Sequence, residues 1–439
     1  MRRGWSLGIF TVVLASGLVL AACGGDDDDS ASATPTSVSD GGEPVDVGDV
    51  DVLGIWGADE LEKFEAMVKP WDDLYTGNVA FTGTRDITAI LTTRVEGGNP
   101  PDIAIPAEIG LFRQFASEGK LTPLSACPGL ESQVRNEYPD SFIDLATVDG
   151  VLYGFFMKAD TKGTIWYNPK VFAENNVEPL TADSSFDDLI ALSQTLLDAG
   201  ITPWSVGVES GAASGWPGSD WIQQILLNEA GGEVYDGIID GSIPFTDEKM
   251  KDAWEKFGQI IHAEGFVLGG PTGANATGFQ ESAFPPFESP PQAAMLYLGG
   301  FASGFIADQF PNAVAGEDYD FFTFPGGGIT GAANIAYAFN SDPGTCSLML
   351  HLAKGESQKI WVELGGFTSV NKEVSLDSYP DAVTRNQADQ LVAASDFRFD
   401  LDDAIGGAVQ TAVFTAVTEY ISDASSLDAI LAGIEAARQ

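Results

Sequence analysis

Three β-like runs near the start of the chain are each followed by side chains suited to ligand binding. Trp56 follows the first run, the pair Arg85 and Asp86 follows the second, and Glu108 follows the third. In open α/β sheets, ligands bind outside the carboxyl ends of the strands, so these side chains are expected at one crevice. An aromatic ring covers the C–H bonds of a sugar, while carboxylate and guanidinium groups form hydrogen bonds with its hydroxyls. The residues therefore indicate a site for a polyhydroxylated ligand.

Two of these residues also have purely structural explanations. Asp86 could be the N-cap of the helix that follows it, and one side chain could serve both purposes. Trp56 could belong to the hydrophobic core. Both explanations stay open at the level of the sequence.

The stretch GVESGAASGWPGSDW, residues 207–221, contains two tryptophans in a loop rich in Gly and Ser. Such rings are normally buried, so either the fold covers them or the loop offers them to a ligand. Ser219 or Asp220 is placed to cap the next helix. Trp221 then falls in the first helical turn, where it can pack inside, whereas Trp216 is the better candidate for an exposed sugar platform.

No pattern in the sequence predicts catalysis or a cofactor. GGGITG, residues 326–331, matches the G-x-G-x-x-G dinucleotide pattern. That pattern requires a helix directly after it, whereas Ile335 and Tyr337 alternate with small residues as in a strand. The two histidines, His262 and His351, have no neighbours at metal-ligand spacing. We therefore expect a protein that is not an enzyme and uses no cofactor or metal.

Strand-like and helix-like runs alternate along the chain. Ser184 and Ser185 each precede an Asp by three residues and open a clear amphipathic helix that ends at Gly200. Strands are predicted at 50–56, 78–83, 102–106 and 201–208, and helices at 59–71, 87–96, 186–199, 246–262 and 408–436. This alternation favours an α/β fold with a largely parallel sheet, in two lobes because about 390 residues exceed one typical domain.

The N-terminal residues predict export. Residues 1–22 have the basic, apolar and small-residue regions of a signal peptide, and LAAC resembles a bacterial lipobox, which implies a lipidated Cys23. An ordinary secreted protein with a chance cysteine is the alternative. Residues 23–47 lack aromatic residues and apolar periodicity, so they are expected to be a disordered tether.

The charge and the remaining cysteines limit the partners and the cross-links. A formal net charge of −43 argues against nucleic acid, because the phosphate backbone would be repelled. Outside the cell, Cys127 and Cys346 could form a disulfide, and two separate buried thiols are the alternative.

These residues together resemble an extracellular carbohydrate-binding protein of an ABC importer, in the maltose-binding-like family. The resemblance covers nearly all of residues 48–439, and the lipobox agrees with it. Its landmarks, in chain order, are TTRVEGGNPPDIAIP, FASEGKLTPL, LYGFFMKADTKGTIWYNPKVF, TPWSVGVESGAASGWPGSDW and WVELGGFTSVNK. The GWPGSDW stretch is similar to the α-glucoside-type branch of the family.

The resemblance implies a two-lobed periplasmic-binding-protein fold (type II-like) that closes on its ligand by a hinge. Three hinge crossings are expected near 155–160, 322–330 and 370–378. The first lobe would contain residues 48–157 with 328–372, and the second 158–327 with 373–439. Cys127 and Cys346 would then share a lobe, which favours a disulfide between them.

The implied function is capture of a sugar, an α-glucoside or gluco-oligosaccharide, for delivery to ABC permease subunits. The chain would act as a monomer on the extracellular face of the cell membrane, or on the periplasmic side where an outer membrane exists, anchored by lipid at Cys23. The expected ligand-binding residues are Trp56, Arg85, Asp86, Glu108, Lys158, Trp216, Asp220 and Trp221.

One segment departs from the family pattern. Family members often carry FDxSDxMP, whereas this chain reads FDLDDAIGG, so Asp400 and Asp403 match, Asp402 replaces the serine, and the methionine and proline are absent. The departure leaves a binding role there, and the identity of the sugar, open. Two rival functions also stay open: the same fold binding a polyamine, iron or a phosphorylated compound, and a secreted glycosidase.

Overall fold

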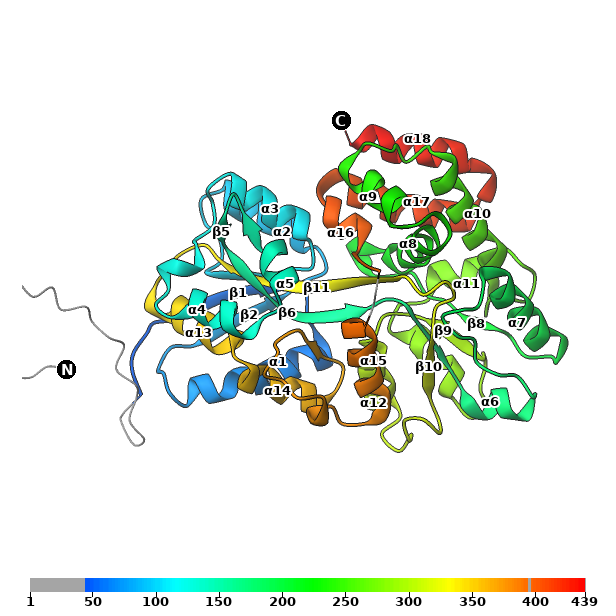
Figure 1. The fold of residues 1–439 in the computed structure, drawn as a ribbon, viewed down its shortest axis with the longest axis horizontal. Coiled ribbons are helices and arrows are strands. Elements are labelled where there is room, and N and C mark those ends of the chain that lie inside the picture. The colour runs from blue at the N-terminus through cyan, green and yellow to red at the C-terminus, as the bar shows by residue number, and fades with distance from the viewer. Residues whose placement is uncertain (1–43, 394–395, 439) are drawn as a thin grey trace, which may run out of the picture. The chain divides into compact units, whose positions relative to one another are not determined.

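The computed structural model describes residues 44–393 and 396–438 (Figure 1). The expected signal peptide and the lipidated Cys23 lie outside these residues. The expected tether is partly described, and its end is ordered: the Val45 N–H donates to the Leu74 carbonyl at 3.1 Å, and Val45 pairs with Tyr75 in a parallel bridge. The prediction of disorder up to residue 47 is therefore wrong at its end, because composition does not reveal this backbone pairing.

The first lobe is built on a mixed sheet. Its strands lie in the order β12 (Thr368–Ser369), β6 (Gly154–Thr161), β11 (Ile329–Ala338), β3 (Ile103–Ile105), β1 (Val50–Gly54) and β2 (Val79–Gly83), and β13 (Phe397–Phe399) also pairs with β11. β1 is parallel to both β2 and β3, as the alternating pattern predicts. β11 runs antiparallel to β3 and β6, because it returns from the second lobe.

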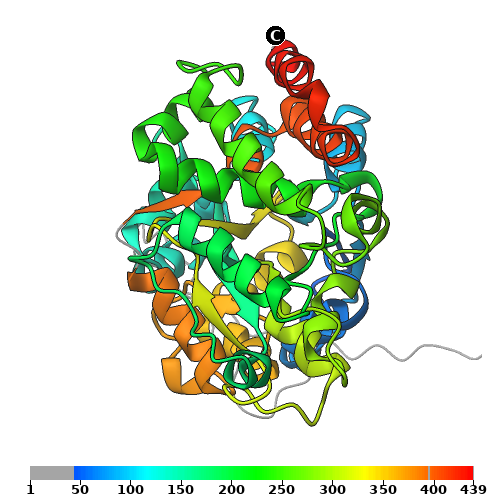
Figure 2. The same cartoon turned by 90° about the vertical axis from the view of Figure 1, so that its right-hand side faces the viewer.

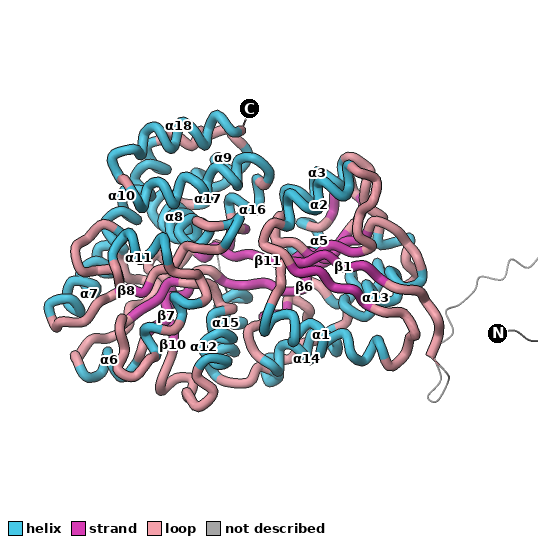
Figure 3. Tube along the Cα trace, turned by 180° about the vertical axis from the view of Figure 1, so that it is seen from behind, coloured by secondary structure: helices cyan, strands magenta, loops and turns pink. Residues whose placement is uncertain are grey.

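Helices cover both faces of this sheet. α1 (Ala58–Asp72), α13 (Pro343–Ala353) and α14 (Gly355–Leu364) pack together on one face. α2 (Ile87–Glu96) and α3 (Ile109–Ser117) lie on the other face (Figures 1 and 3). The apolar sides of these helices and the strands between them form one core. The smaller elements of this lobe are α4 (Leu130–Glu137), α5 (Asp140–Leu145), β4 (Thr147–Val148) and β5 (Val151–Leu152).

The second lobe has its own sheet and helices (Figure 2). The strand order is β10 (Asp320–Thr323), β7 (Thr164–Tyr167), β9 (Met295–Tyr297) and β8 (Trp204–Ser205). The helices are α6 (Pro169–Glu174), α7 (Phe186–Asp198), α8 (Trp216–Ala230), α9 (Gly232–Asp240), α10 (Glu248–Ile261), α11 (Gly270–Ala276), α12 (Ala302–Gln309), α16 (Leu401–Ile405), α17 (Gly407–Ser422) and α18 (Leu427–Ala437). α15 (Ala382–Ala393) contacts β6 and β12 of the first sheet.

In this lobe, one prediction from local sequence patterns is confirmed and another is met only in part. The capping box predicted before α7 is present, with Ser185 and Asp188 each accepting from the backbone N–H of the other. The predicted strand at 201–208 is much shorter, because only β8 pairs with β9. At Gly207 the chain instead lies so close to the Gly278 carbonyl that a Cβ would be 2.6 Å from its oxygen.

The chain passes between the two lobes at three places in the described residues. The first passage joins β6 to β7 at residues 162–163, and the second joins β10 to β11 at residues 324–328. The second contains the glycine-rich motif, with Gly326 and Gly327 at φ +104° and +78°. The strand β11 follows this motif directly, so the expectation that no helix follows is confirmed. The motif therefore lacks the helix that a dinucleotide-binding turn requires.

The third passage lies later than expected. Val383 of α15 touches a second-lobe cluster, but Phe399 still packs in the first core, and Leu401 lies in the main core of the second lobe. The prediction of 370–378 is not met, because Tyr379 and Ala388 pack in the first core and β13 pairs with β11.

Cys127 and Cys346 form a disulfide within the first lobe. The bond connects the segment after a short 3-10 helix (Leu124–Ala126) to α13, across 219 residues of sequence. It therefore closes a long loop of the unfolded chain.

We expect the Cys127→Ser/Cys346→Ser double variant to unfold more easily, by roughly 2–5 kcal/mol, because its unfolded chain is no longer constrained. Urea denaturation of the wild type with and without dithiothreitol measures the same effect independently. The double variant is the control, since its midpoint should not respond to the reductant. A wild-type midpoint that is equal in both conditions would contradict a stabilising bond.

Candidate ligand-binding site

A cavity of about 130 Å³ lies where the two lobes meet. Its walls come from both cores and from the passages between them. Trp56 and Glu108 belong to the first lobe, and Trp216 and Phe279 to the second. The lining also includes Glu60, Arg85, Lys158, Asp160, Lys162, Ser210, Phe301, Phe305, Asn334, Asp400, Asp402, Asp403, Gln410 and Phe414.

Trp56 is a core residue that also lines the cavity, so its contact with a ligand stays a prediction. Its side chain is 1% exposed and packs in the first core, with its ring parallel to that of Phe81 at 6.0 Å and edge-on to that of Trp361 at 4.8 Å. It also lines the cavity. Its indole N–H has no hydrogen-bond partner among the described residues.

Alternation along β6 brings charged side chains to the cavity. Residues 158, 160 and 162 lie on one face of an extended chain, and all three line the cavity. Lys158 Nζ donates to Glu60 Oε1 at 3.0 Å and lies 3.6 Å from Asp160 Oδ2. Glu60 Oε2 in turn lies 3.6 Å from the Arg85 guanidinium. The predicted Arg85 and Lys158 are both at the cavity, and the period-two charge pattern of KADTK would have revealed Asp160 and Lys162.

These neighbours keep the buried charges ionised. Burial alone would raise the pKa of Glu60, but the charges of Lys158 and Arg85 outweigh it, so the pKa ends below its usual value. Burial alone would lower the pKa of Lys158, but Asp160 and Glu60 more than offset it, so the pKa is raised. The buried pair is therefore charged at neutral pH.

Glu108 and Asp86 have different outcomes. Glu108 lines the cavity, and its Oε1 accepts from the Thr88 hydroxyl at 3.0 Å. Burial raises the pKa of Glu108, and its Oε2 has no partner within the described chain. Asp86 is exposed, stands outside the cavity lining, and occupies the N-cap position of α2 without a side-chain capping bond. The structure therefore gives no support for Asp86 as a ligand contact.

Trp216 is a half-buried ring in the cavity wall. It is the first residue of α8, and it lies 5.2 Å from the ring of Phe279 and 6.0 Å from that of Phe301. The turn before it needs a glycine, because Gly215 has φ +113° and a Cβ there would lie 2.1 Å from the Phe414 carbonyl oxygen. This turn places the ring in the cavity wall, as its proposed role as a platform requires.

Trp221 and Asp220 lie behind the cavity. Trp221 is 1% exposed and packs on Trp204 at 4.9 Å and on Tyr297 at 4.5 Å, so it is a core residue and does not line the cavity. Asp220 is 2% exposed and also stands outside the lining. Its Oδ1 accepts from Lys162 Nζ at 2.7 Å, so its contact is with a lysine of the cavity wall.

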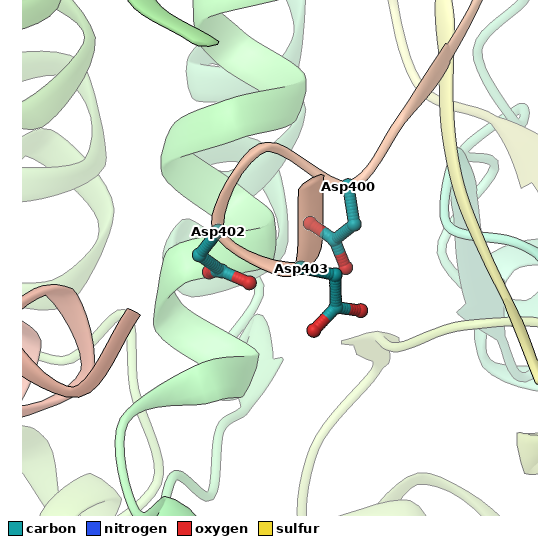
Figure 4. Close-up of side chains that lie close together, drawn as sticks. All are labelled: Asp400, Asp402 and Asp403. Atoms are coloured by element: carbon teal, nitrogen blue, oxygen red, sulfur yellow. The ribbon is translucent and has the colours of Figure 1, made fainter. Parts of the chain in front are cut away.

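The altered FDLDDAIGG segment contributes three carboxylates. Asp400, Asp402 and Asp403 line the cavity from the N-terminal end of α16, close to α8 (Figure 4). Asp402 accepts hydrogen bonds from Ser219 and, at 2.7 Å, from Gln223. Burial and then the charge of Asp400 raise the pKa of Asp402 to about 8. Although the segment departs from the family pattern, all three of its carboxylates line the cavity.

Two lobes joined by three passages of chain around a shared cavity define a two-lobed solute-binding protein of the periplasmic-binding-protein fold. The sequence places the chain more narrowly: it belongs to the family described as bacterial extracellular solute-binding protein, which it matches over residues 57–342.

Two relatives and one solved structure show how far the similarity extends. The chain is 35% identical over 382 residues to the osmoprotective compounds-binding protein GgtB of Synechocystis sp., covering 85% of this chain and 89% of that protein. It is 29% identical over 403 residues to the alpha-glucosides-binding periplasmic protein AglE of Rhizobium meliloti, covering 88% and 86%. A chitin oligosaccharide binding protein has the same fold, with a TM-score of 0.75 at 19% identity, covering 90% of this chain and 98% of that one.

The described residues contain no helix with both the length and the apolar character that a membrane span requires.

The raised pKa of Asp402 predicts that stability falls as the pH rises. The folded state holds a proton up to about pH 8, whereas an unfolded aspartate releases it near pH 4, so the stabilisation is complete below about pH 4 and lost above about pH 8. We expect the melting temperature to fall by a few degrees between about pH 6 and pH 9. Differential scanning fluorimetry across this range measures the slope.

The Asp402→Asn variant should have a clearly smaller slope, because it carries no proton that can be lost. The exposed Asp252→Asn variant on α10 is the matched control and should keep the wild-type slope. Equal slopes in all three proteins would show that Asp402 does not hold the proton.

Proposed function

We propose that this chain is the substrate-binding subunit of an ABC importer that captures a sugar, an α-glucoside or a short gluco-oligosaccharide, between its lobes. It hands the sugar to a membrane permease and makes or breaks no bond itself. In this proposal Cys23 carries the lipid anchor, so the domain works at the outer face of the cell membrane. The lobes close by bending at the three passages, and the ligand stabilises the closed form by its higher affinity for it.

The observation that carries the proposal is the set of unsatisfied polar atoms in an aromatic cavity. Among the described lining residues, the buried polar atoms without a partner are Trp56 Nε1, Ser210 Oγ, Glu108 Oε2 and Asp400 Oδ1. A ligand that satisfies them must accept from an N–H and donate to carboxylate oxygens. Sugar hydroxyls do both, and the rings of Trp216, Phe279 and Phe301 cover their C–H surfaces.

The names of the relatives support a neutral glycoside. One binds alpha-glucosides and the other osmoprotective compounds, and a small glycoside can meet both descriptions. The cavity size agrees with a compact ligand. Its volume of about 130 Å³ is close to the ~150 Å³ of a cavity that admits one benzene ring. In this conformation the enclosed space therefore suits about one sugar ring, and longer ligands would extend beyond it.

A polyamine is the second candidate, because the lining holds six carboxylates and three cationic side chains. The three cations are paired with two of these acids, Arg85 and Lys158 with Glu60 and Lys162 with Asp400, so Glu108, Asp402 and Asp403 remain for a cationic ligand. The same pairing disfavours a phosphorylated ligand, which would need free cations.

Thermal shift with maltose, trehalose, malto-oligosaccharides and spermidine separates the candidates, since specific binding raises stability by mass action. Release of glucose during incubation would instead indicate a glycosidase.

Trp216→Ala should weaken binding of the preferred sugar about tenfold or more, equivalent to about 1.4 kcal/mol, because the stacking face is lost. Isothermal titration calorimetry gives the affinity. Trp216→Phe, which keeps an aromatic ring, should lose less.

Phe310→Ala is the control for this experiment. Phe310 is a half-buried ring packed against the same hydrophobic cluster as Trp216, and it does not line the cavity. Its removal should leave the affinity unchanged. An unchanged affinity in Trp216→Ala would remove the ring from the site.

A further inference from the structure

Lys162 occupies the first passage between the lobes. It lies in the two-residue link between β6 and β7, and its side chain is buried, with a residue exposure of 6%. Its backbone N–H donates to the Thr330 carbonyl at 2.8 Å. Thr330 lies in β11 just after the second passage, so the lysine is fixed where two passages run next to each other.

The Lys162 ammonium group donates to two carboxylates and lies over an aromatic ring. An ammonium group has three N–H donors. Nζ donates to Asp220 Oδ1 at 2.7 Å and to Asp400 Oδ2, and it lies 5.0 Å from the centre of the Trp216 ring. A cation over an indole face is an attractive contact at this distance. Although Lys162 lines the cavity, both of these hydrogen bonds hold protein groups in place.

The partners of Lys162 are the groups that face the cavity or stand directly behind it. Trp216 is the proposed stacking ring, and Asp400 offers its unpartnered Oδ1 to the cavity. Asp220 lies outside the lining and holds the lysine from behind. One buried ammonium group thus fixes a ring from α8 and a carboxylate from the third passage relative to the first passage.

We propose that Lys162 is a positioning residue: it sets the stacking ring of Trp216 and the carboxylate of Asp400 relative to the hinge. The proposal rests on the sugar-binding function proposed above. Without the ammonium group, Asp220 and Asp400 would be two buried carboxylates with no counter-charge, and they would move apart or take up protons. In either case Trp216 would lose the group that holds its face.

The charges around Lys162 support this role. Burial alone would lower the pKa of the lysine, but the carboxylates of Asp220 and Asp400 outweigh it and raise the pKa well above its usual value. Asp402 and Asp403 of α16 act in the same direction from farther away. The lysine is therefore positively charged at every pH at which binding would be measured.

The test is the pH profile of sugar affinity in Lys162→Met, measured by calorimetry with the sugar that shifts the wild-type melting temperature most. We expect its dissociation constant to exceed the wild-type value about tenfold at about pH 8.5, where the uncompensated carboxylates are charged. The ratio should shrink to about threefold at about pH 5.5, where protons replace the missing charge. A ratio that is the same at both pH values, whether one or larger, would overturn the proposal.

Two control variants test whether the effect comes from the positive charge at position 162. Lys162→Arg retains the cation over the ring and should keep a ratio near one at both pH values. Lys170→Met removes an exposed lysine that pairs with Asp318 in the same lobe, and should change neither value. If Lys162→Met does not fold, Asp220→Asn replaces it: it should weaken affinity several-fold although Asp220 does not line the cavity, and an unchanged affinity would overturn the proposal.

A fluorescence measurement made without ligand tests the role of Lys162 independently of the proposed sugar binding. The emission spectrum of the wild type minus that of Trp216→Phe isolates the contribution of one indole ring. The same difference taken in a Lys162→Met background should be shifted, because a charge near the ring has been removed. An unshifted difference spectrum overturns the role of Lys162, whereas failure of the wild type to bind any sugar overturns the proposed function alone.

Discussion

The antiparallel pairing of β6 with β11 is the interaction on which the other features of the site depend. The two strands pair from Gly154 with Tyr337 to Thr161 with Gly331 and lead directly into two of the three passages between the lobes. Their hydrogen bonds hold the first two passages side by side. The same pairing fixes which face of β6 is turned toward the cavity, and hence where its charged residues lie.

Burying charge between two lobes is costly unless each charge has a partner. The site meets this requirement with two lysines of one strand face, each between two carboxylates. Lys158 is paired with Glu60 and Asp160, and Lys162 with Asp220 and Asp400. Each lysine also lies over an aromatic ring, Phe301 in one case and Trp216 in the other. Each lysine thus has counter-charges at hand, and the unpartnered polar atoms left in the cavity include the carboxylate oxygens Glu108 Oε2 and Asp400 Oδ1.

Much of the fold was predictable from the sequence, because alternating strands and helices and a capping box are local patterns. At the site, Trp56, Arg85 and Glu108, which the strand ends indicated, line the cavity, and their contact with a ligand stays a prediction. Asp86 failed because a residue at a helix N-terminus can point to solvent, and nothing local to the sequence decides its direction. Trp221 failed because an aromatic residue one turn into a helix is turned toward the core by packing across the whole lobe. The third passage was misplaced because β13 is a three-residue strand whose pairing with β11 joins residues far apart in the chain.

The side-chain alternation of β6 has a consequence for how this chain can vary. Lys158, Asp160 and Lys162 reach one cavity only because a single residue separates each of them from the next, which keeps all three on one face of the extended chain. Inserting or deleting a single residue between the two lysines would turn one of them to the opposite side of the sheet. Length changes are tolerated in surface loops such as the one before α7, but this five-residue segment should exclude insertions and deletions.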